Sequence, residues 1–363
     1  MKILVAMSGG VDSSVVAHLL KKQGHDVIGV RFTLWSDPLA PPLAHVLPSK
    51  CCNAQTVSRA NRVAKDLGID LHILDLEKEF KRDVVDPFID GYRKGKTPNP
   101  CITCNRTVKF GRLLTLMEEL GCEKLATGHY AQVVTEYASD GSETHTLLEA
   151  VDLCKDQSYY LYGLTQKQLS KVIFPLGSLY KHDVIGHAKD FGVPYSEESY
   201  RESQDLCFFP EKEPAAFLKR YISDAAPGAI SLEDGTVVGR HAGLPFYTIG
   251  QRKGLRIGGL KIPLHVTRKE INTNTIYVAP SGADLKSKLT AKELRWISWI
   301  PELNKNFSFE ARIHSLGKKH KGTLIHNGDT LEFGFNEGLR GIAEGQSIVV
   351  YRDKEVVGGG VIS

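Results

Sequence analysis

The sequence predicts an α/β fold with a doubly wound parallel sheet, followed by a small β-rich linker domain and a C-terminal β-barrel. Up to about residue 205, apolar β-prone segments alternate with segments of helical periodicity, which is the pattern of parallel sheets covered by helices. Beyond that point, glycines and turn signals such as Glu233-Asp234-Gly235 separate short β-prone segments. A chain of 363 residues has room for two or three domains.

The chain opens with a βαβ unit. Residues 2–7 are apolar and β-prone, a Ser-Gly-Gly turn interrupts them, and apolar residues at helical spacing then continue to Gly24 before a second β-prone segment at 26–32. The alternation recurs, with helices expected at 53–67 and 106–120 and strands at 71–74 and 124–127. We expect three domains: a nucleotide-binding domain at 1–205, a small central domain at 206–271 and a barrel at 272–363.

Composition narrows the class of protein. With 42% hydrophobic and 24% charged residues, the chain is of ordinary globular type, and no apolar segment approaches the roughly 18 residues of a membrane span. The N-terminus predicts a buried strand and no signal peptide, so we expect a cytoplasmic protein without a membrane partner. Because seven cysteines are an odd number in a reducing compartment, catalytic or metal-binding roles are favoured over structural disulfides.

The turn Ser8-Gly9-Gly10-Val11-Asp12-Ser13-Ser14 is typical of an anion site. Its glycines allow close approach of a ligand, and the N–H groups and dipole of the following helix attract phosphate. No GxxxxGK[ST] motif occurs, so the lysine that a Walker loop places on the β- and γ-phosphates is missing. We therefore expect chemistry at the α-phosphate with release of pyrophosphate; the simpler alternative is an ordinary strand-to-helix turn.

Two cysteines are candidates for chemistry. Cys104 ends a Cys101-Ile102-Thr103-Cys104 motif that follows the rigid segment 97–100, so we expect it near a helix N-terminus, where its pKa is lowered and it can act as a nucleophile. Half of a zinc site, a redox pair and helix-start packing are the alternatives, although Cys51-Cys52 lack the spacing of a second zinc half-site. Cys207 lies at the expected domain boundary, where clefts form; taken alone, it is more typical of a small buried hydrophobe.

Basic residues form two groups in the second half of the chain. Both groups are dense enough to suggest contacts with RNA phosphates, and sheets of a small barrel recognise RNA by shape and backbone. Basic surface loops are also common in proteins that bind no nucleic acid. The groups are Arg240, Arg252, Lys253, Arg256, Lys261, Arg268 and Lys269, and Lys318-Lys319-His320-Lys321.

An ordered set of motifs over nearly the whole length resembles the tRNA-specific 2-thiouridylases, which are PP-loop enzymes. The phosphate turn alone is shared with other ATP pyrophosphatases, so the specificity comes from the cysteines and the later motifs. The set comprises Met7 to Ser14, Thr97 to Pro100 with Cys104-Asn105, Ala126 to Tyr130, Lys155 to Tyr159, Glu202 to Gln204 with Cys207-Phe208, Tyr247 to Gly254, and Gly345-Gln346.

The resemblance implies ATP-dependent 2-thiolation of the wobble uridine, position 34, of tRNA. ATP, with Mg²⁺, adenylates O2 of the uracil, and a persulfide on Cys207 then delivers sulfur to C2 with loss of AMP. Cys104 attacks the persulfide, which leaves a Cys104–Cys207 disulfide for reduction. The implied partners are tRNA and a persulfide-donating sulfurtransferase or cysteine desulfurase.

The same resemblance carries binding residues over to this chain. Those implied for ATP are Ala6, Met7, Ser8, Gly9, Gly10, Val11, Asp12, Ser13, Phe32 and Gly128. Those implied for tRNA are Asn99, Pro100, Cys101, His129, Lys155, Asp156, Gln157, His314, Ser315 and Gln346.

One departure from the family pattern leaves alternatives open. Many relatives have aspartate at the position of Cys101, where it handles protons beside the target base. Either water or His129 takes that role here, or Cys101, Cys104 and Cys207 converge to ligate an iron–sulfur cluster. Other readings are a PP-loop enzyme of the 4-thiouridine or small-molecule synthetase type, and a nucleotide-sensing protein without turnover.

Overall fold

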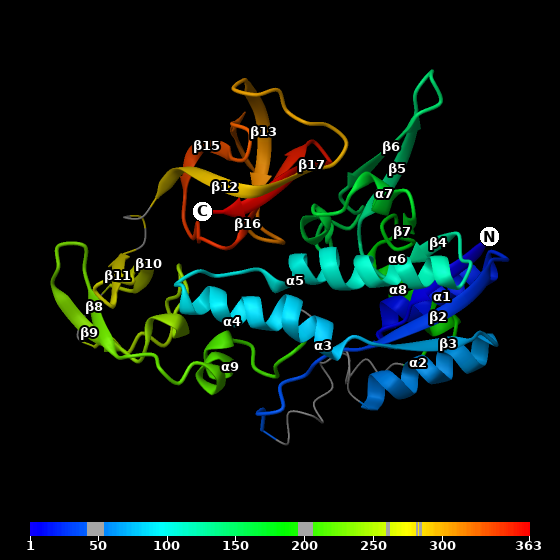
Figure 1. Cartoon of the computed structure of the whole chain (residues 1–363), viewed down its shortest axis with the longest axis horizontal. Coiled ribbons are helices and arrows are strands. Elements are labelled where there is room, and N and C mark those ends of the chain that lie inside the picture. The colour runs from blue at the N-terminus through cyan, green and yellow to red at the C-terminus, as the bar shows by residue number, and fades with distance from the viewer. Residues whose placement is uncertain (42–53, 195–205, 259–261, 281, 283–284) are drawn as a thin grey trace.

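The computed structural model describes residues 1–41, 54–194, 206–258, 262–280, 282 and 285–363. Its first sheet has the strand order β3-β2-β1-β4-β7, and each neighbouring pair is parallel. This arrangement confirms the predicted parallel α/β sheet (Figure 1). The strands are β1 (Lys2–Ala6), β2 (Asp26–Thr33), β3 (Leu71–Asp75), β4 (Lys124–Ala126) and β7 (Val172–Ile173).

Helices cover both faces of this sheet because successive side chains of a strand point to opposite faces. Ile3 and Val5 of β1 belong to a buried cluster with α1, α2 and α8, whereas Leu4 belongs to a second cluster with α6. The helices that follow the strands are α1 (Val11–Lys22), α2 (Ala54–Leu67), α6 (Phe110–Glu119) and α8 (Lys181–Asp190).

A layer of short helices extends from the sheet towards the other domains (Figure 1). Among them, two single π-helical turns interrupt the α-helices, and the second of these contains one of the candidate cysteines. The segments are α3 (Glu77–Phe80), η2 (Lys81–Val85), α4 (Asp86–Arg93), α5 (Pro100–Thr103), η3 (Cys104–Lys109), η4 (Ser158–Leu161) and α7 (Gln166–Leu169).

The expected boundary at residue 206 is too early. Phe208, Phe209 and Phe217 pack with Phe80 and Phe88 in one buried cluster, which we call the aromatic cluster. Helix α9 (Pro214–Tyr221) thereby lies against α3 and α4 of the first domain. Aromatic burial outweighs the change in composition that suggested the boundary, because it packs residues beyond 206 against the first domain.

The central sheet also extends beyond its expected end at residue 271. Strand β11 (Thr275–Pro280) pairs with β10 (Leu264–Glu270) and with β8 (Gly228–Ser231), and β9 (Val237–His241) completes the sheet. The expected boundary therefore falls in the turn of the β10–β11 hairpin, where Asn274 has a φ of 49°. The barrel begins only at β12.

The last six strands form an antiparallel barrel, which β12 closes by pairing with both β15 and β17. The first domain contributes a hairpin, β5 (Gln132–Tyr137) and β6 (Glu143–Leu148), that meets β17 at Leu148. The barrel strands are β12 (Lys286–Trp296), β13 (Asn306–Arg312), β14 (His320–His326), β15 (Leu331–Leu339), β16 (Ser347–Arg352) and β17 (Glu355–Ile362).

Candidate active site

The glycine turn between β1 and α1 has a backbone that only glycine fits. Gly9 has a φ of 78°, and a Cβ built there would lie 2.0 Å from the carbonyl oxygen of Thr56. Gly10 is the N-cap of α1 and has no side chain to offer to the first N–H groups of the helix. The hydroxyls of Ser13 and Ser14 donate to the Gly10 carbonyl at 3.1 and 2.9 Å. The turn thus presents helix N–H groups to an anion.

The end of β4 lies directly against this turn. A Cβ on Gly128 would be 3.2 Å from the backbone nitrogen of Ser13 and 3.3 Å from the side chain of Asp12. Phe32, at the end of β2, is half-buried and contacts the aromatic cluster. The structure therefore brings the sequence-predicted ATP residues of three strands together at one edge of the sheet, where ligands of doubly wound folds bind.

One cation of this site, Lys181, belongs to no motif that the sequence analysis identified. Lys181, the first residue of α8, places its Nζ 2.5 Å from Oδ1 of Asp12, and the hydroxyl of Tyr130 donates to the same oxygen at 3.1 Å. The Lys181 side chain is 13% exposed and that of Asp12 is 32% exposed, so the pair remains open to a ligand. The pair therefore sets an ammonium group beside the start of α1, next to the glycine turn.

The helix that contains the CxxC motif begins earlier than expected. Asn99 is its N-cap and accepts a hydrogen bond from the Cys101 nitrogen at 3.2 Å, and Pro100 is the first helical residue. Cys101 therefore lies in the first turn, whereas Cys104 is the fifth residue and begins the π-helical turn. The predicted effect of the helix N-terminus applies to Cys101 more than to Cys104, because it fades beyond the first turn.

Cys104 and Cys207 border the same group of side chains. Cys104 is buried among the residues of the aromatic cluster. Cys207, which is itself partly exposed, packs against the same cluster. Phe32 packs there too, which joins the thiols to the nucleotide edge of the sheet. Cys51, Cys52 and the segment 202–204 lie outside the described residues.

His129 is a neutral imidazole in this environment. Its Nδ1 lies 2.7 Å from the Thr127 hydroxyl, and its ring packs against Phe110 and Phe174 with centroids 5.7 and 5.9 Å apart. Burial, and secondarily the charge of Lys109, lower the pKa of His129 to about 3. A group with that pKa is a poor proton acceptor at neutral pH, so of the two proton-handling candidates water is favoured.

The barrel holds the segment that leads to the CxxC helix. The Thr97 nitrogen donates to the Glu344 carbonyl at 2.7 Å, and Nε2 of Gln346 donates to the Thr97 carbonyl at 2.8 Å. Gly345 has a φ of 90°, and a Cβ there would lie 3.1 Å from the Thr97 backbone. Gln346, an expected tRNA residue, thus uses its amide to position residues 97–100.

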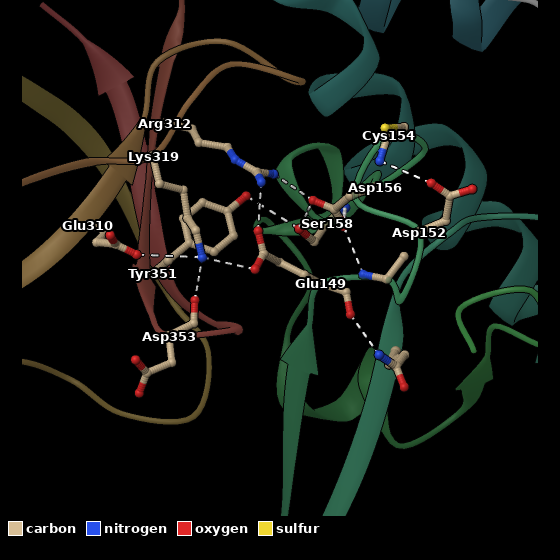
Figure 2. A network of polar contacts seen from close by, with 12 residues as sticks. Glu149, Asp152, Cys154, Asp156, Ser158, Glu310, Arg312, Lys319, Tyr351 and Asp353 are labelled. Atoms are coloured by element: carbon tan, nitrogen blue, oxygen red, sulfur yellow. Dashed lines mark hydrogen bonds and ion pairs between the residues drawn. The ribbon is translucent and has the colours of Figure 1, made fainter. Parts of the chain in front are cut away.

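Asp156 corrects another expectation, because its carboxylate is fully buried and faces the barrel (Figure 2). Oδ2 accepts from Arg312 Nη1 at 2.6 Å, and Oδ1 accepts from the nitrogens of Ala150 and Ser158. Arg312 Nη2 donates to Glu149 Oε1 at 2.7 Å. Arg312 thus pairs with the carboxylate that was expected to contact tRNA. Asp156 instead accepts hydrogen bonds from the backbone of the 149–158 loop and fixes its conformation.

The neighbours of Asp156 lie nearer to the surface. Lys155 and Gln157 are half-buried, and Oε1 of Gln157 accepts from the Tyr130 nitrogen at 3.1 Å. Tyr130 also contacts Asp12, so this loop is linked to the phosphate turn. Ser315 of the barrel hydrogen-bonds to the side chain of Tyr160, whose pKa is raised chiefly by burial, with a further contribution from Cys101.

Part of the expected basic surface is used internally. Nζ of Lys319 contacts Glu149 Oε2 at 3.0 Å and the Asp353 carbonyl at 2.6 Å (Figure 2). Arg268 lies 3.3 Å from the centroid of the Tyr277 ring, and burial lowers the pKa of Lys269 to about 8. Lys319 is therefore engaged by acidic and carbonyl oxygens within the protein, whereas the stacked Arg268 side chain remains 43% exposed. Arg240, Arg252, Lys253 and Arg256 are exposed, and Lys261 lies outside the described residues.

Within the described part of the chain, no three His, Cys, Asp or Glu side chains gather as ligands of a metal ion. Cys101, Cys104 and Cys207 are all described, and they do not form the convergent thiol set that an iron–sulfur cluster needs. In the same ranges, no helix is both long and apolar enough to cross a membrane.

Fold and site together define a nucleotide-binding α/β enzyme with accessory β domains and two thiols beside its nucleotide edge. Family models match consecutive parts of the chain: a tRNA methyl transferase HUP domain at residues 1–211, a tRNA methyl transferase PRC-barrel domain at 215–280 and an aminomethyltransferase β-barrel domain at 286–362. These matches leave open which group is transferred, because their descriptions name methyl transfer and the site carries thiols.

Full-length relatives decide the question. The chain is 40% identical over 363 residues to the tRNA-specific 2-thiouridylase MnmA of Halothermothrix orenii, covering 99% of this chain and 98% of the relative. It is 42% identical over 362 residues to the protein of the same name from Trichlorobacter lovleyi, with coverages of 99% and 97%. The chain belongs to the family of the tRNA-specific 2-thiouridylases, as the motifs indicated.

A solved structure of a 4-thiouridine synthetase–RNA complex with bound ATP gives a more distant match. It is 20% identical and covers 61% of this chain and 50% of its own, with a TM-score of 0.36.

Proposed function

We propose that this enzyme thiolates C2 of the wobble uridine in tRNA at the expense of ATP, with Cys207 as the sulfur carrier and Cys104 as its partner. One observation carries the proposal: Phe32, Cys104 and Cys207 border the same aromatic cluster at the end of β2. Because Phe32 ends one of the strands whose carboxyl ends meet at the phosphate turn, its packing in this cluster supports a site shared by the two thiols and the nucleotide. A nucleotide-activated base and a sulfur carrier can therefore share one site.

The first step is adenylation. O2 of the uracil attacks the α-phosphorus of ATP, and the bond to the β-phosphate oxygen breaks with departure of pyrophosphate. The helix N–H groups behind Gly10 and the ammonium of Lys181 bind the departing phosphates, while Asp12 orients Lys181. Mg²⁺ would accompany ATP as its phosphate counter-ion, with Asp12 as a carboxylate in the first turn of α1 to hold it.

The second step moves sulfur. The terminal sulfur of a Cys207 persulfide attacks C2, and the C2–O2 bond breaks with loss of AMP. The thiolate of Cys104 then attacks the Cys207 sulfur. The electron pair of the S–S bond passes to the sulfur on C2, which leaves 2-thiouridine and a Cys104–Cys207 disulfide. An external dithiol reduces the disulfide, and a persulfide-donating sulfurtransferase or cysteine desulfurase reloads Cys207.

Mass spectrometry of the nucleosides from an unmodified tRNA incubated with ATP and a persulfide donor tests the reaction. We expect 2-thiouridine at position 34 with the native enzyme and none with Cys207→Ser. Cys207→Ser should still release pyrophosphate when tRNA is added, since adenylation precedes sulfur transfer. Cys122→Ser is the matched control, because Cys122 is buried in a different cluster.

Three outcomes would contradict the proposal. Full thiolation by Cys207→Ser would exclude this residue as the carrier. Pyrophosphate release that is absent or independent of tRNA would favour the nucleotide-sensing or small-molecule alternatives. Iron and acid-labile sulfide in anaerobically purified enzyme, at a level that tracks activity, would replace the persulfide with a cluster.

A further inference from the structure

The carboxylate of Asp37 is buried where the chain leaves the end of β2, and its side chain is 0% exposed. Oδ1 accepts hydrogen bonds from the Leu39 nitrogen at 2.9 Å and from the hydroxyl of Tyr221 at 2.5 Å, and Oδ2 accepts from Nε of Arg220 at 2.7 Å. The two partners on α9 lie 183 and 184 positions further along the chain. Asp37 therefore ties the segment after β2 to the end of α9.

The guanidinium of Arg220 also binds a second carboxylate. Its Nη1 and Nη2 donate to the two carboxylate oxygens of Glu211, at 2.6 and 3.0 Å, which uses the planar fork of arginine. The charge of Arg220 compensates for the burial of Asp37, which would be costly without a partner. Burial, with a further contribution from its hydrogen bond to Asp37, raises the pKa of Tyr221, so its hydroxyl stays protonated as a donor. We call Asp37, Glu211, Arg220 and Tyr221 the Asp37 network.

The Asp37 network holds the backbone next to Cys207. The nitrogen of Asp37 donates to the carbonyl of Phe208 at 3.1 Å, and Phe208 directly follows Cys207. Glu211 attaches the chain to Arg220 three residues further on. Residues 206–210 belong to neither a helix nor a strand, so no regular ladder of hydrogen bonds places them. The position of Cys207 therefore depends on contacts from outside its segment, and the Asp37 network supplies several of them.

The Asp37 network is also joined to the nucleotide edge of the sheet. In the sequence, Trp35 lies between Phe32, at the end of β2, and Asp37. Its ring centroid is 6.5 Å from that of Phe208 and 6.1 Å from that of Tyr221, and both Phe32 and Trp35 pack against the aromatic cluster. A short packed segment thus connects the expected ATP residue Phe32 with the support of Cys207.

We propose that Asp37 is a positioning residue for sulfur transfer. Through Arg220 and Tyr221 it holds the segment of Cys207 at the distance from Cys104 and from the nucleotide edge that the reaction needs. The inference rests on the proposed function, since it takes Cys207 as the sulfur carrier. Placement matters because an error of about 1 Å at the reacting atoms can lower a rate about 10²-fold.

The first test is Asp37→Asn, which keeps the size of the side chain and removes its charge. We expect kcat for tRNA thiolation to fall about 10- to 100-fold. The KM for tRNA and the single-turnover rate of tRNA-dependent pyrophosphate release should stay within about 2-fold of the native values, because adenylation does not use Cys207. This division between the two half-reactions is not expected of a residue that only stabilises the fold.

A second measurement reports on the two thiols directly and needs neither ATP nor tRNA. Diamide oxidises a pair of adjacent thiols to a disulfide and is itself reduced to the hydrazine, and mass spectrometry of the peptides quantifies the Cys104–Cys207 disulfide. We expect this disulfide to form about 10-fold more slowly in Asp37→Asn than in the native protein. Both proteins are compared well below their thermal midpoints, so that a difference in stability does not enter the rate.

Tyr221→Phe separates positioning from folding. It retains the ring that packs on Trp35 and Phe217 and removes only the hydroxyl that donates to Asp37. We expect thiolation and disulfide formation to slow by about 3- to 10-fold, the equivalent of one hydrogen bond. The matched control is Tyr162→Phe, which removes a buried hydroxyl that lies 3.2 Å from the Ser347 hydroxyl, outside the Asp37 network, and should leave both rates native.

Native rates of disulfide formation in Asp37→Asn and Tyr221→Phe would overturn the proposal. An equal loss of pyrophosphate release and thiolation would also overturn it, since the network would then have a structural role only. Thiolation of tRNA by Cys207→Ser would overturn the proposed function and this proposal with it. Slow disulfide formation in Asp37→Asn alongside that result would identify the proposed function as the part that failed.

Discussion

Two aspartate–cation pairs of the same enzyme have nearly the same geometry and different surroundings. Asp12 and Lys181 are 2.5 Å apart, and Asp156 and Arg312 are 2.6 Å apart. In each pair the cation comes from a distant segment of the chain. The side chains of the first pair are 32% and 13% exposed, whereas those of the second are 0% and 7% exposed.

Exposure decides what each pair can do. Water and a ligand can reach the first pair, so its lysine can exchange part of its contact with Asp12 for contacts with phosphate. The second pair is surrounded by protein, and each carboxylate oxygen of Asp156 already accepts at least one hydrogen bond. In this enzyme the solvent-accessible pair is suited to binding a ligand, whereas the pair enclosed by protein holds two segments of the chain together.

The largest effect should come from breaking the closed pair. Arg312→Met leaves the carboxylates of Asp156 and Glu149 buried without their main counter-charge, and loss of one partner from a buried pair costs about 3–5 kcal/mol. We expect urea unfolding of the barrel to shift by this amount. Tryptophan fluorescence reports it, because the partly buried rings of Trp296 and Trp299 pack against the barrel core.

Arg352→Met is the control for Arg312→Met. Its pair with Glu355 also lies in the barrel, at 2.6 Å, but the Arg352 side chain is 52% exposed. Exposed pairs contribute about 0–1 kcal/mol, so this variant should unfold close to the native midpoint. Equal destabilisation by the two variants would refute the distinction between open and closed pairs.

The open pair should show the reverse pattern, with a large effect on activity and a small one on stability. Lys181→Met removes a cation from the proposed phosphate site, and loss of one such stabilising group lowers the rate by about 10²–10³-fold. We expect this loss in tRNA-dependent pyrophosphate release, with unfolding changed by no more than about 1 kcal/mol. Lys189→Met, an exposed lysine of the same helix, should retain native activity; a Lys181→Met enzyme that does likewise would remove Lys181 from the site.

The smallest effect concerns His129, a half-buried ring whose pKa is lowered chiefly by desolvation. His129 has a folded-state pKa of about 3, below its ordinary value of 6.5, so below pH 6.5 the unfolded chain binds a proton that the folded chain does not. The contribution of His129 to stability is therefore complete above pH 6.5 and is lost as the pH falls towards 3. In urea unfolding between pH 6 and 4, we expect His129→Gln to lose less stability than the native protein. If the two proteins lost stability in parallel as the pH fell, the lowered pKa of His129 would be contradicted.

The pattern of apolar residues predicted the first domain well because its helices bury one face each and its strands, covered on both faces, are continuously apolar. The helix expected at 53–67 and the strand at 26–32 differ from α2 and β2 by one residue. The domain boundaries were wrong because they depend on packing at a distance. Nothing local to Phe208 or Phe217 shows that their rings will join the aromatic cluster of α3 and α4.

The candidate site was predictable where backbone geometry demands particular residues, as at Gly9. Its cation was not, because Lys181 reaches Asp12 across 169 positions of sequence and a lone lysine at a helix start has no signature. The burial of Asp156 was equally hidden, since its partner Arg312 is 156 residues away. In the sequence alone, residues that act through long-range contacts cannot be distinguished from ordinary polar residues.

The contact between Gln346 and Thr97 has a consequence for the order of events during synthesis. Thr97 leaves the ribosome 249 residues before Gln346, and Asp156 leaves it 156 residues before Arg312. A nascent chain can therefore complete its phosphate turn while the segments at 97–100 and 149–158 still lack their supports. The support of these two segments therefore waits until the barrel strands that carry Arg312 and Gln346 have been synthesised.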